Sequence, residues 1–298
     1  MENKNIPKRI TLAYFSGTGC TKAVCDCFEE QLRKMGVDST VINIADQNPL
    51  DVKETDLLIV FSPVYAFRLA AIVETWIKNL PVVKNKSAVI ISVSGGGEMP
   101  PNMACRVHGK RLLERKGYAI IYEEMIVMPS NFASQADHKL NYDLIRVLPN
   151  KVKRVIADIV SGNIRITSPK LLDRFIASIG KAEHFGARFF GASIHASQEC
   201  NQCGLCIRNC PKKNIRMVNG LPKFGYQCLW CLKCIYSCPC KALTPRIMKF
   251  SVLKEGFDLD SMSEKALKES DVIEDREHSN ILWQGVIDYV NHNKGEES

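Results

Sequence analysis

One cysteine motif occurs twice between residues 200 and 239 and constrains this chain more than any other feature. The first copy reads Cys200-x-x-Cys203-x-x-Cys206-x-x-x-Cys210-Pro211. The second copy repeats this spacing from Cys228 to Pro239, so eight of the thirteen cysteines lie in forty residues. Paired C-x-x-C also suits structural zinc, but zinc does not explain three evenly spaced cysteines followed by a distant fourth and a proline. Two [4Fe–4S] clusters explain that spacing.

The same motif predicts which cysteines share a cluster. In such runs the fourth cysteine of each copy binds the cluster of the other copy. We therefore predict two ligand sets, Cys200, Cys203, Cys206 and Cys238 for one cluster, and Cys210, Cys228, Cys231 and Cys234 for the other. The stretch resembles the bacterial-type two-cluster ferredoxins, which implies a small α+β domain.

Three features near the cysteine motif are predicted to have structural roles and not to bind a cluster. The internal repeat aligns Cys240 with Lys212, a solvated charge, so Cys240 is not expected to be a ligand. His195 is expected at the surface or in packing, because eight cysteines already complete two clusters. Asn219-Gly220 between the halves is typical of a hairpin turn.

Length and composition indicate a two-domain globular protein. The chain has 298 residues, and no apolar run reaches the roughly 18 residues needed to span a membrane. The N-terminus shows no signal-peptide pattern, and thirteen cysteines without an export signal indicate reduced thiols. We expect a cytoplasmic protein with no membrane association, in an anaerobic setting because oxygen damages low-potential clusters.

The net charge of +8 is unevenly distributed. Residues 140–250 hold 18 Lys/Arg against 5 Asp/Glu, whereas residues 251–298 hold 5 against 12, and residues 200–250 hold no acidic residue. Part of the positive charge would offset anionic clusters, and the rest would steer an acidic redox partner such as a ferredoxin. No nucleic-acid-binding motif accompanies the charge, so nucleic acid is not expected as a partner. A homo-oligomer stays open.

The first 160 residues alternate between strand and helix patterns. Short apolar, β-prone runs predict five strands, at 9–16, 38–43, 57–61, 87–93 and 118–128. Helical patterns predict helices at 21–35, before 79, at 102–116 and at 137–159. Strands that alternate with helices over short loops indicate a parallel sheet with helices on both faces.

Three loops follow these strands and carry the polar and glycine residues of a candidate site. Ser16-Gly17-Thr18-Gly19-Cys20-Thr21 leads from a strand into a helix N-terminus, where free N–H groups favour a phosphate. It is neither a Walker loop nor a Gly-x-Gly-x-x-Gly motif. A Ser/Gly turn with a helix cap is the alternative.

With the segments that begin at Ser62 and Ser94, this pattern resembles the flavodoxin family. The resemblance implies a doubly wound parallel sheet of order 2-1-3-4-5 that binds FMN at the carboxyl ends of the strands. It implies phosphate contacts from Ser16, Gly17, Thr18, Gly19, Cys20 and Thr21. It implies ring contacts from Pro63, Val64, Tyr65, Ala66, Phe67, Ser94, Gly95, Gly96 and Gly97. The family's usual Trp is missing from the first ring loop, and the loop 94–102 has no aromatic residue, which predicts a more open ring.

The predicted domains are a flavodoxin-like domain at 1–161, a linker or packing segment at 162–195, a ferredoxin domain at 196–250 and an acidic tail at 251–298. The linker could hold one or two helices between 171 and 190. The tail contains a short amphipathic run at 281–290, and could fold onto the basic ferredoxin face or serve as a docking segment.

Together these features resemble fusion proteins of a flavodoxin and a two-cluster ferredoxin. The resemblance implies an electron-transfer protein that relays electrons between FMN and two [4Fe–4S] clusters and exchanges them with an acidic partner. The alternative is a flavin-dependent reductase of a small organic acceptor, fed through the clusters. No motif places a proton donor, so no catalytic residue is predicted.

Overall fold

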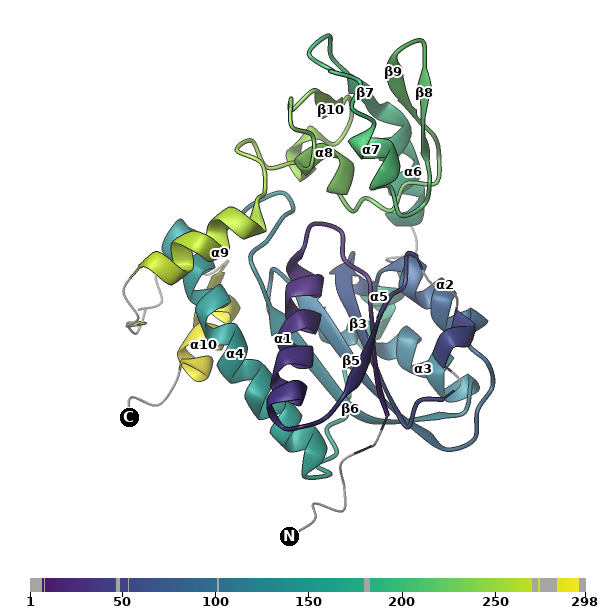
Figure 1. Ribbon diagram of the computed structural model, residues 1–298, viewed down its shortest axis with the longest axis vertical. Coiled ribbons are helices and arrows are strands. Elements are labelled where there is room, and N and C mark those ends of the chain that lie inside the picture. The colour runs from purple at the N-terminus through teal and green to yellow at the C-terminus, as the bar shows by residue number, and fades with distance from the viewer. Residues whose placement is uncertain are drawn as a thin grey trace.

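A parallel sheet forms the centre of the N-terminal half (Figure 1). The computed structural model describes residues 7, 9–46, 49–52, 54–100, 102–179, 183–269, 273 and 283–294. The parallel strands lie in the order β2-β1-β3-β5-β6 and span β1 (Ile10–Tyr14), β2 (Ser39–Asn43), β3 (Leu57–Tyr65), β5 (Lys86–Ser94) and β6 (Tyr118–Val127). Counted without the two-residue strand β4, this is the predicted order 2-1-3-4-5, so the doubly wound fold is confirmed.

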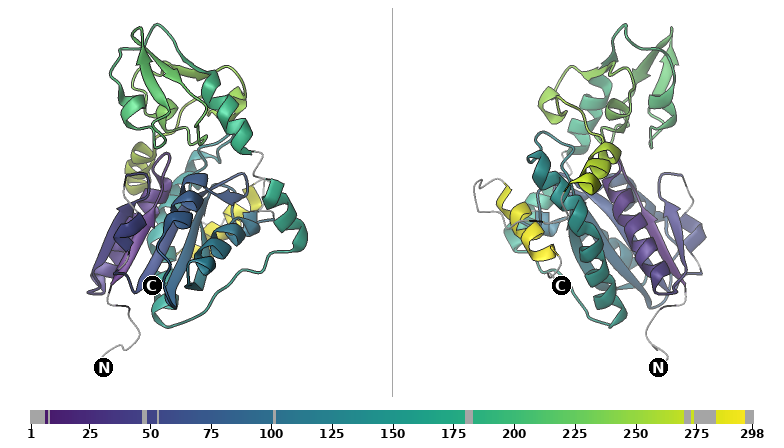
Figure 2. Two further views of the ribbon diagram at one scale, coloured as in Figure 1. Left: turned by 90° about the vertical axis from the view of Figure 1, so that its right-hand side faces the viewer. Right: turned by 60° about the vertical axis from the view of Figure 1, so that its left-hand side comes forward.

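Helices cover both faces of this sheet (Figure 2). One face packs against α1 (Cys20–Lys34) and α4 (His138–Val160), the other against α2 (Ala71–Asn79) and α3 (Val107–Arg115). Successive residues of a strand point to opposite faces, and in β3 Leu57 joins the first core while Leu58 joins the second. Burial on both faces explains the continuous apolar runs of these strands.

The third strand and the third helix differ from the sequence prediction. Strand β3 continues to Tyr65 instead of ending at Phe61, and β4 (Arg68–Leu69) pairs back on it. Ala66 and Phe67 turn the chain with φ of 37° and 62°, the two positive angles that a tight hairpin turn requires. The helix predicted from 102 begins as a 3₁₀ turn, η2 (Asn102–Ala104); a further 3₁₀ turn, η1 (Pro49–Val52), precedes β3.

A small domain caps the carboxyl end of the sheet (Figure 2). Its elements are α6 (Glu183–Ser193), β7 (Ile194–Ala196), α7 (Leu205–Arg208), β8 (Ile215–Val218), β9 (Leu221–Phe224), α8 (Lys233–Tyr236) and β10 (Leu243–Pro245). Antiparallel pairs join β7 to β10 and β8 to β9. Asn219 and Gly220 form the predicted turn between β8 and β9, both with positive φ. His195 is exposed on β7, as expected.

The predicted linker segment at 162–195 holds two helices, as the sequence allowed. Helix α5 (Leu171–Ile179) packs near η2, whereas α6 contributes Ala187 and Phe190 to the core of the small domain. Residues 180–182 of the predicted helical region lie outside the described residues. None of the helices in the described part of the chain is long and apolar enough to cross a bilayer.

The tail returns to the N-terminal domain. After η4 (Lys249–Ser251), helix α9 (Leu259–Lys268) packs on α4, and α10 (Gln284–Asn293) buries Val286 and Val290 against β6 and α4. Arg146 and Arg154 on α4 hold the tail through Glu269 and the carbonyl of His292. The idea that the tail folds onto the basic ferredoxin face is wrong for these helices. Residues 281 and 282, at the start of the amphipathic run, lie outside the described residues.

Candidate functional site

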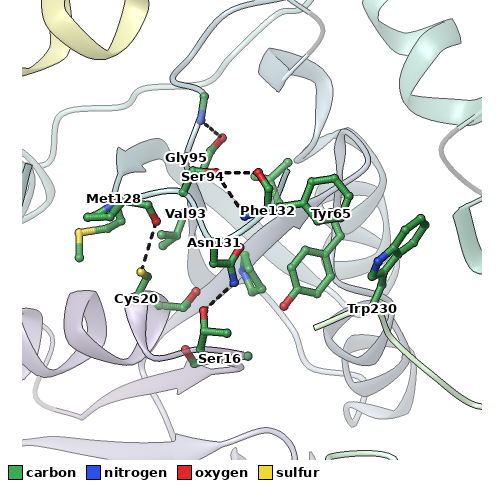
Figure 3. Close-up of a pocket in the computed structure, with 18 of the residues that line it drawn as sticks. Ser16, Cys20, Tyr65, Val93, Ser94, Gly95, Met128, Asn131, Phe132 and Trp230 are labelled. Carbon is green, nitrogen blue, oxygen red and sulfur yellow. Dashed lines mark hydrogen bonds between the residues drawn. The ribbon is translucent and has the colours of Figure 1, made fainter. Parts of the chain in front are cut away.

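A cavity of about 410 Å³ opens at the carboxyl ends of β1, β3, β5 and β6 (Figure 3). It is lined by thirteen of the fifteen residues predicted to contact FMN, namely Ser16, Gly17, Thr18, Cys20, Thr21, Pro63, Val64, Tyr65, Ala66, Phe67, Ser94, Gly95 and Gly96. Its volume lies in the ~300–1,000 Å³ range of small-molecule sites. The structure therefore brings the three predicted loops together, and only Gly19 and Gly97 fall outside the lining.

The loop from Ser16 to Thr21 is shaped as an anion cradle. The Ser16 hydroxyl accepts a hydrogen bond from the Gly19 amide at 3.1 Å, which folds the loop over the start of α1. Gly19 is the N-cap of α1, has φ of 107°, and caps the helix with no side chain. The first N–H groups of α1 are thus available to a phosphate at the positive end of the helix dipole.

Cys20 at the start of α1 is a partly buried cysteine. Its Sγ contacts the carbonyl oxygen of Pro129 at 3.7 Å. Burial raises the pKa of the Cys20 thiol to about 12, because a thiolate would lose its hydration there. The side chain therefore stays protonated at neutral pH.

The Pro63–Phe67 loop forms the β3–β4 hairpin. Hydrogen bonds and an ion pair of neighbouring buried residues stabilise it. The Ser62 hydroxyl accepts from the Ala70 amide at 3.0 Å. Both carboxylate oxygens of Glu74 accept from Arg68 Nη2 at 2.8 Å, and both side chains are buried. This ion pair anchors the strand that follows the Ala66–Phe67 turn, so the aromatic residues of the loop are presented at a fixed position.

The Ser94–Gly97 loop approaches its neighbours closely. The Ser94 hydroxyl accepts from the Gly96 amide at 3.2 Å and from the Asn102 side chain at 3.3 Å. A Cβ at Gly95 would lie 2.7 Å from Cβ of Ser130, so only glycine fits there. Gly97 packs away from the cavity, where a Cβ would lie 3.4 Å from the backbone of Gly285 on α10.

A fourth wall of the cavity has no counterpart in the sequence predictions. It consists of Val93, Met128, Pro129, Ser130, Asn131, Phe132 and Trp230. Residues 128–132 follow β6, and the rule that ligands bind at the carboxyl ends of parallel strands could have found them. Nothing in the sequence pattern indicates Trp230, which comes from the small domain, between Cys228 and Cys231.

The eight motif cysteines line two smaller cavities in the small domain. One is lined by Cys200, Cys203, Cys206 and Cys238, the other by Cys210, Cys228, Cys231 and Cys234. The last cysteine of each run thus lies in the cavity of the other run, as the predicted ligand sets require. Cys240 lines neither cavity.

These thiols would need positive charge to ionise. Burial raises the pKa of Cys228 to about 12 and that of Cys231 to about 11. Cluster iron would supply that charge, since metal binding requires thiolates and releases their protons. Among the described residues, no group of three or more His, Cys, Asp or Glu side chains is arranged to hold a metal ion. The ligand sets therefore stay a prediction that the grouping of the cysteines fits.

The cavity at the carboxyl ends of the strands lies next to the cysteine-lined part of the small domain. A Cβ on Gly17 would lie 2.7 Å from the carbonyl oxygen of Cys231 and 2.7 Å from the Tyr65 hydroxyl. Asn131 donates from its side chain to the Thr18 hydroxyl at 2.6 Å, and its carbonyl accepts from the Tyr236 hydroxyl at 2.8 Å. The Ser16–Thr21 loop is therefore in direct contact with the loop that carries Cys231.

Comparison with known proteins shows that the N-terminal part of the chain is similar to flavodoxins. A family model of the flavodoxin domain matches residues 11–116. The two-electron reduced flavodoxin of Megasphaera elsdenii is 25% identical, with 40% of this chain and 85% of that chain covered and a TM-score of 0.35. Oxidised Flavodoxin 1 of Bacillus cereus is 13% identical, with 51% and 97% covered and a TM-score of 0.39. No curated protein matches the chain.

A third similar structure is the rubredoxin oxygen:oxidoreductase of the anaerobe Desulfovibrio gigas. It is 15% identical, with 53% of this chain and 37% of that chain covered and a TM-score of 0.38. The family match establishes a flavodoxin-like domain at the N-terminus and supports FMN as its cofactor. This indicates electron transfer or flavoprotein oxidoreductase chemistry. The family match ends before residues 200–239, so the resemblance of that stretch to ferredoxins stays a prediction.

Proposed function

We propose that this protein is an electron-transfer flavoprotein that relays electrons between FMN in the N-terminal cavity and two [4Fe–4S] clusters in the small domain. The observation that carries the proposal is the contact between Gly17 and Cys231. A predicted phosphate-binding residue and a predicted cluster ligand lie against each other there. Such a contact keeps two redox sites close without a mobile partner between them.

FMN exchanges one or two electrons, and each cluster exchanges one, so the combination couples one-electron and two-electron chemistry. The residues of this chain bind and position the groups. The cradle at α1 holds the phosphate, the hairpin at Tyr65 contacts the ring, and the two cysteine quartets hold the clusters. Cys231 of the second quartet is buried, and shielding of a ligand from water tunes the potential of its cluster.

One of the two proposed cluster sites lies nearer to the flavin cavity than the other. The quartet of Cys210, Cys228, Cys231 and Cys234 is proximal to the flavin, because its Cys228–Cys231 loop lines the flavin cavity through Trp230. None of the residues around the other quartet, at 200–206 and 238–239, lines the flavin cavity. We call this second cluster site distal, and Cys203 in it is exposed. Electrons would therefore enter or leave the protein at the distal site.

We further propose that an acidic redox protein, such as a ferredoxin, docks at the distal site. Exposed cationic side chains lie on the segments next to its lining, namely Arg208, Arg216 and Lys223. Arg208 is tied to the ligand loop through a 2.9 Å hydrogen bond to the Cys203 carbonyl. Complementary charge of this kind accelerates encounter with a negative partner.

The composition of the anaerobically purified protein tests the proposal. It predicts about eight iron atoms, about eight sulfides and one FMN per chain. Bound zinc in place of iron would overturn the proposal of two [4Fe–4S] clusters. A protein without flavin would overturn the proposal of an FMN site. For the partner, the rate of reaction with an acidic ferredoxin should fall steeply as ionic strength rises. A rate independent of salt would disprove electrostatic docking while leaving the relay untouched.

A further inference from the structure

Trp230 occupies an unusual place, between two predicted ligands of the proximal cluster and at the wall of the flavin cavity. Its φ is 57°, and its amide donates to Cys228 Sγ at 3.3 Å. Its side chain is 9% exposed and is the single contribution of the small domain to the lining of the cavity among the described residues. Figure 3 shows Trp230, Tyr65 and Phe132 projecting from three separate segments into the same region.

The small domain fixes the orientation of this indole. The Nε1–H donates to the Ser251 hydroxyl at 3.2 Å, and the ring stacks on Phe190 with centroids 5.0 Å apart at 24°. From the other domain, Phe132 meets the indole edge-on with centroids 5.6 Å apart. A Cβ at Gly186 would lie 3.3 Å from the ring, so α6 also packs closely on it.

The N-terminal domain supplies three of the four aromatic side chains that line the cavity, Tyr65, Phe67 and Phe132. The Ser94–Gly97 loop has no aromatic side chain, and the hairpin supplies Tyr65 and Phe67 only. A planar aromatic ring such as that of a flavin is best held by stacked or edge-on aromatic partners. The indole of Trp230 adds a fourth aromatic side chain to the lining, beside Tyr65, Phe67 and Phe132.

We propose that Trp230 is part of the flavin site, so that the loop of the proximal cluster forms one wall of the FMN cavity. This inference rests on the proposed function. The loop from Cys228 to Cys231 is held in shape by the cluster that both cysteines bind. Loss of that cluster releases the loop, removes the indole from the cavity and weakens FMN binding. By linkage, bound FMN strengthens binding of the cluster by the same equilibrium factor by which the cluster strengthens binding of FMN.

The first test measures FMN release from the anaerobic holoprotein by the recovery of free-flavin fluorescence. Trp230→Leu should release FMN about tenfold faster, since it removes the aromatic contact while keeping an apolar side chain. Trp230→Phe, which retains a smaller aromatic ring, should lie between Trp230→Leu and the wild type. Trp76→Leu is the control, because Trp76 is a buried indole on α2 outside the cavity. It should release FMN at the wild-type rate.

Iron content is measured on every variant to separate the outcomes. If Trp230→Leu retains its full iron content and releases FMN at the wild-type rate, the inference is wrong. If Trp230→Leu loses iron as well, Trp230→Phe decides: faster FMN release at full iron content supports the role of the indole, and unchanged release contradicts it.

The second test needs no substitution. Oxidative destruction of the clusters in the wild-type protein should accelerate FMN release, and unchanged release would contradict the coupling. A wild-type protein that contains no FMN or no iron would instead refute the proposed function, so the two failures are distinguishable.

Discussion

Gly17 of the Ser16–Thr21 loop lies against the backbone of Cys231 of the second cysteine run. A Cβ at position 17 would approach the Cys231 carbonyl oxygen and the Tyr65 hydroxyl to 2.7 Å each. Residues more than two hundred positions apart in the sequence are thus in contact at the junction of the two candidate sites. The proposed electron relay depends on that junction.

Replacing Gly17 with alanine should push the two domains apart. Because the nearest atom is a backbone oxygen, the chain itself must move, and we expect a loss of about 1–3 kcal/mol in the free energy of unfolding. Gly96→Ala is the matched control in the same cavity, since its Cβ would meet only the Asn102 side chain at 3.5 Å. Urea unfolding of the holoprotein measures both variants, and equal stabilities would contradict the close contact.

The Tyr236 hydroxyl connects three segments. It donates to the Asn131 carbonyl at 2.8 Å and accepts from the Leu253 amide at 2.9 Å. Tyr236→Phe leaves both partners without this bond, which should cost about 1–3 kcal/mol in the free energy of unfolding. Tyr226→Phe, at a position 64% exposed in the same domain, should change the stability little. A Tyr236→Phe protein as stable as Tyr226→Phe would show that the junction does not need this hydroxyl.

The buried ion pair behind the hairpin should be sensitive to the loss of one charge. Glu74→Gln leaves Arg68 buried without its counter-ion, and we expect a destabilisation of about 3–5 kcal/mol. Glu54 pairs with Arg9 at 2.7 Å on the surface, so Glu54→Gln should cost about 0–1 kcal/mol. Chemical unfolding compares the two. Similar small losses would mean that the Arg68–Glu74 pair does not anchor the hairpin.

The exchange of the fourth cysteines makes a spectroscopic prediction. Cys210→Ser should damage the same cluster as Cys231→Ser, although the two residues belong to different runs. Cys238→Ser should likewise match Cys203→Ser. Spectra of the reduced proteins by electron paramagnetic resonance, with iron counts, test this pairing, and Cys240→Ser should keep the wild-type spectrum. A Cys210→Ser spectrum that matches Cys203→Ser instead would disprove the exchange.

The parts of this structure that follow local patterns could be predicted. Alternating apolar runs and short loops predict a parallel sheet, and the resemblance to flavodoxins implies its strand order. The three loops with Ser, Gly and Pro residues lie at the carboxyl ends that the fold requires. The grouping of the cysteines could be predicted from their spacing, because in this repeated motif the fourth cysteine of each run joins the other run's ligand set.

The missed features depend on contacts between distant segments. Residues 128–132 carry no recognisable motif and line the cavity only because β6 lies next to β5. Trp230 lines the cavity at the carboxyl ends of the strands because the small domain packs over it, and no local sequence pattern encodes that packing. The tail carries acidic charge, yet its apolar residues Val286 and Val290 decide its place on α4. Burial of an apolar face outweighed the attraction between charged segments.

The proposed relay passes electrons from a partner through the distal and proximal clusters to FMN. Anaerobic stopped-flow mixing with a reduced acidic ferredoxin tests it directly by following flavin absorbance. In a Cys203→Ser protein that keeps the proximal cluster and FMN, the flavin should be reduced at least about tenfold more slowly, a rise of about 1.4 kcal/mol in the barrier. Reduction of the flavin at the wild-type rate in that variant would contradict the relay.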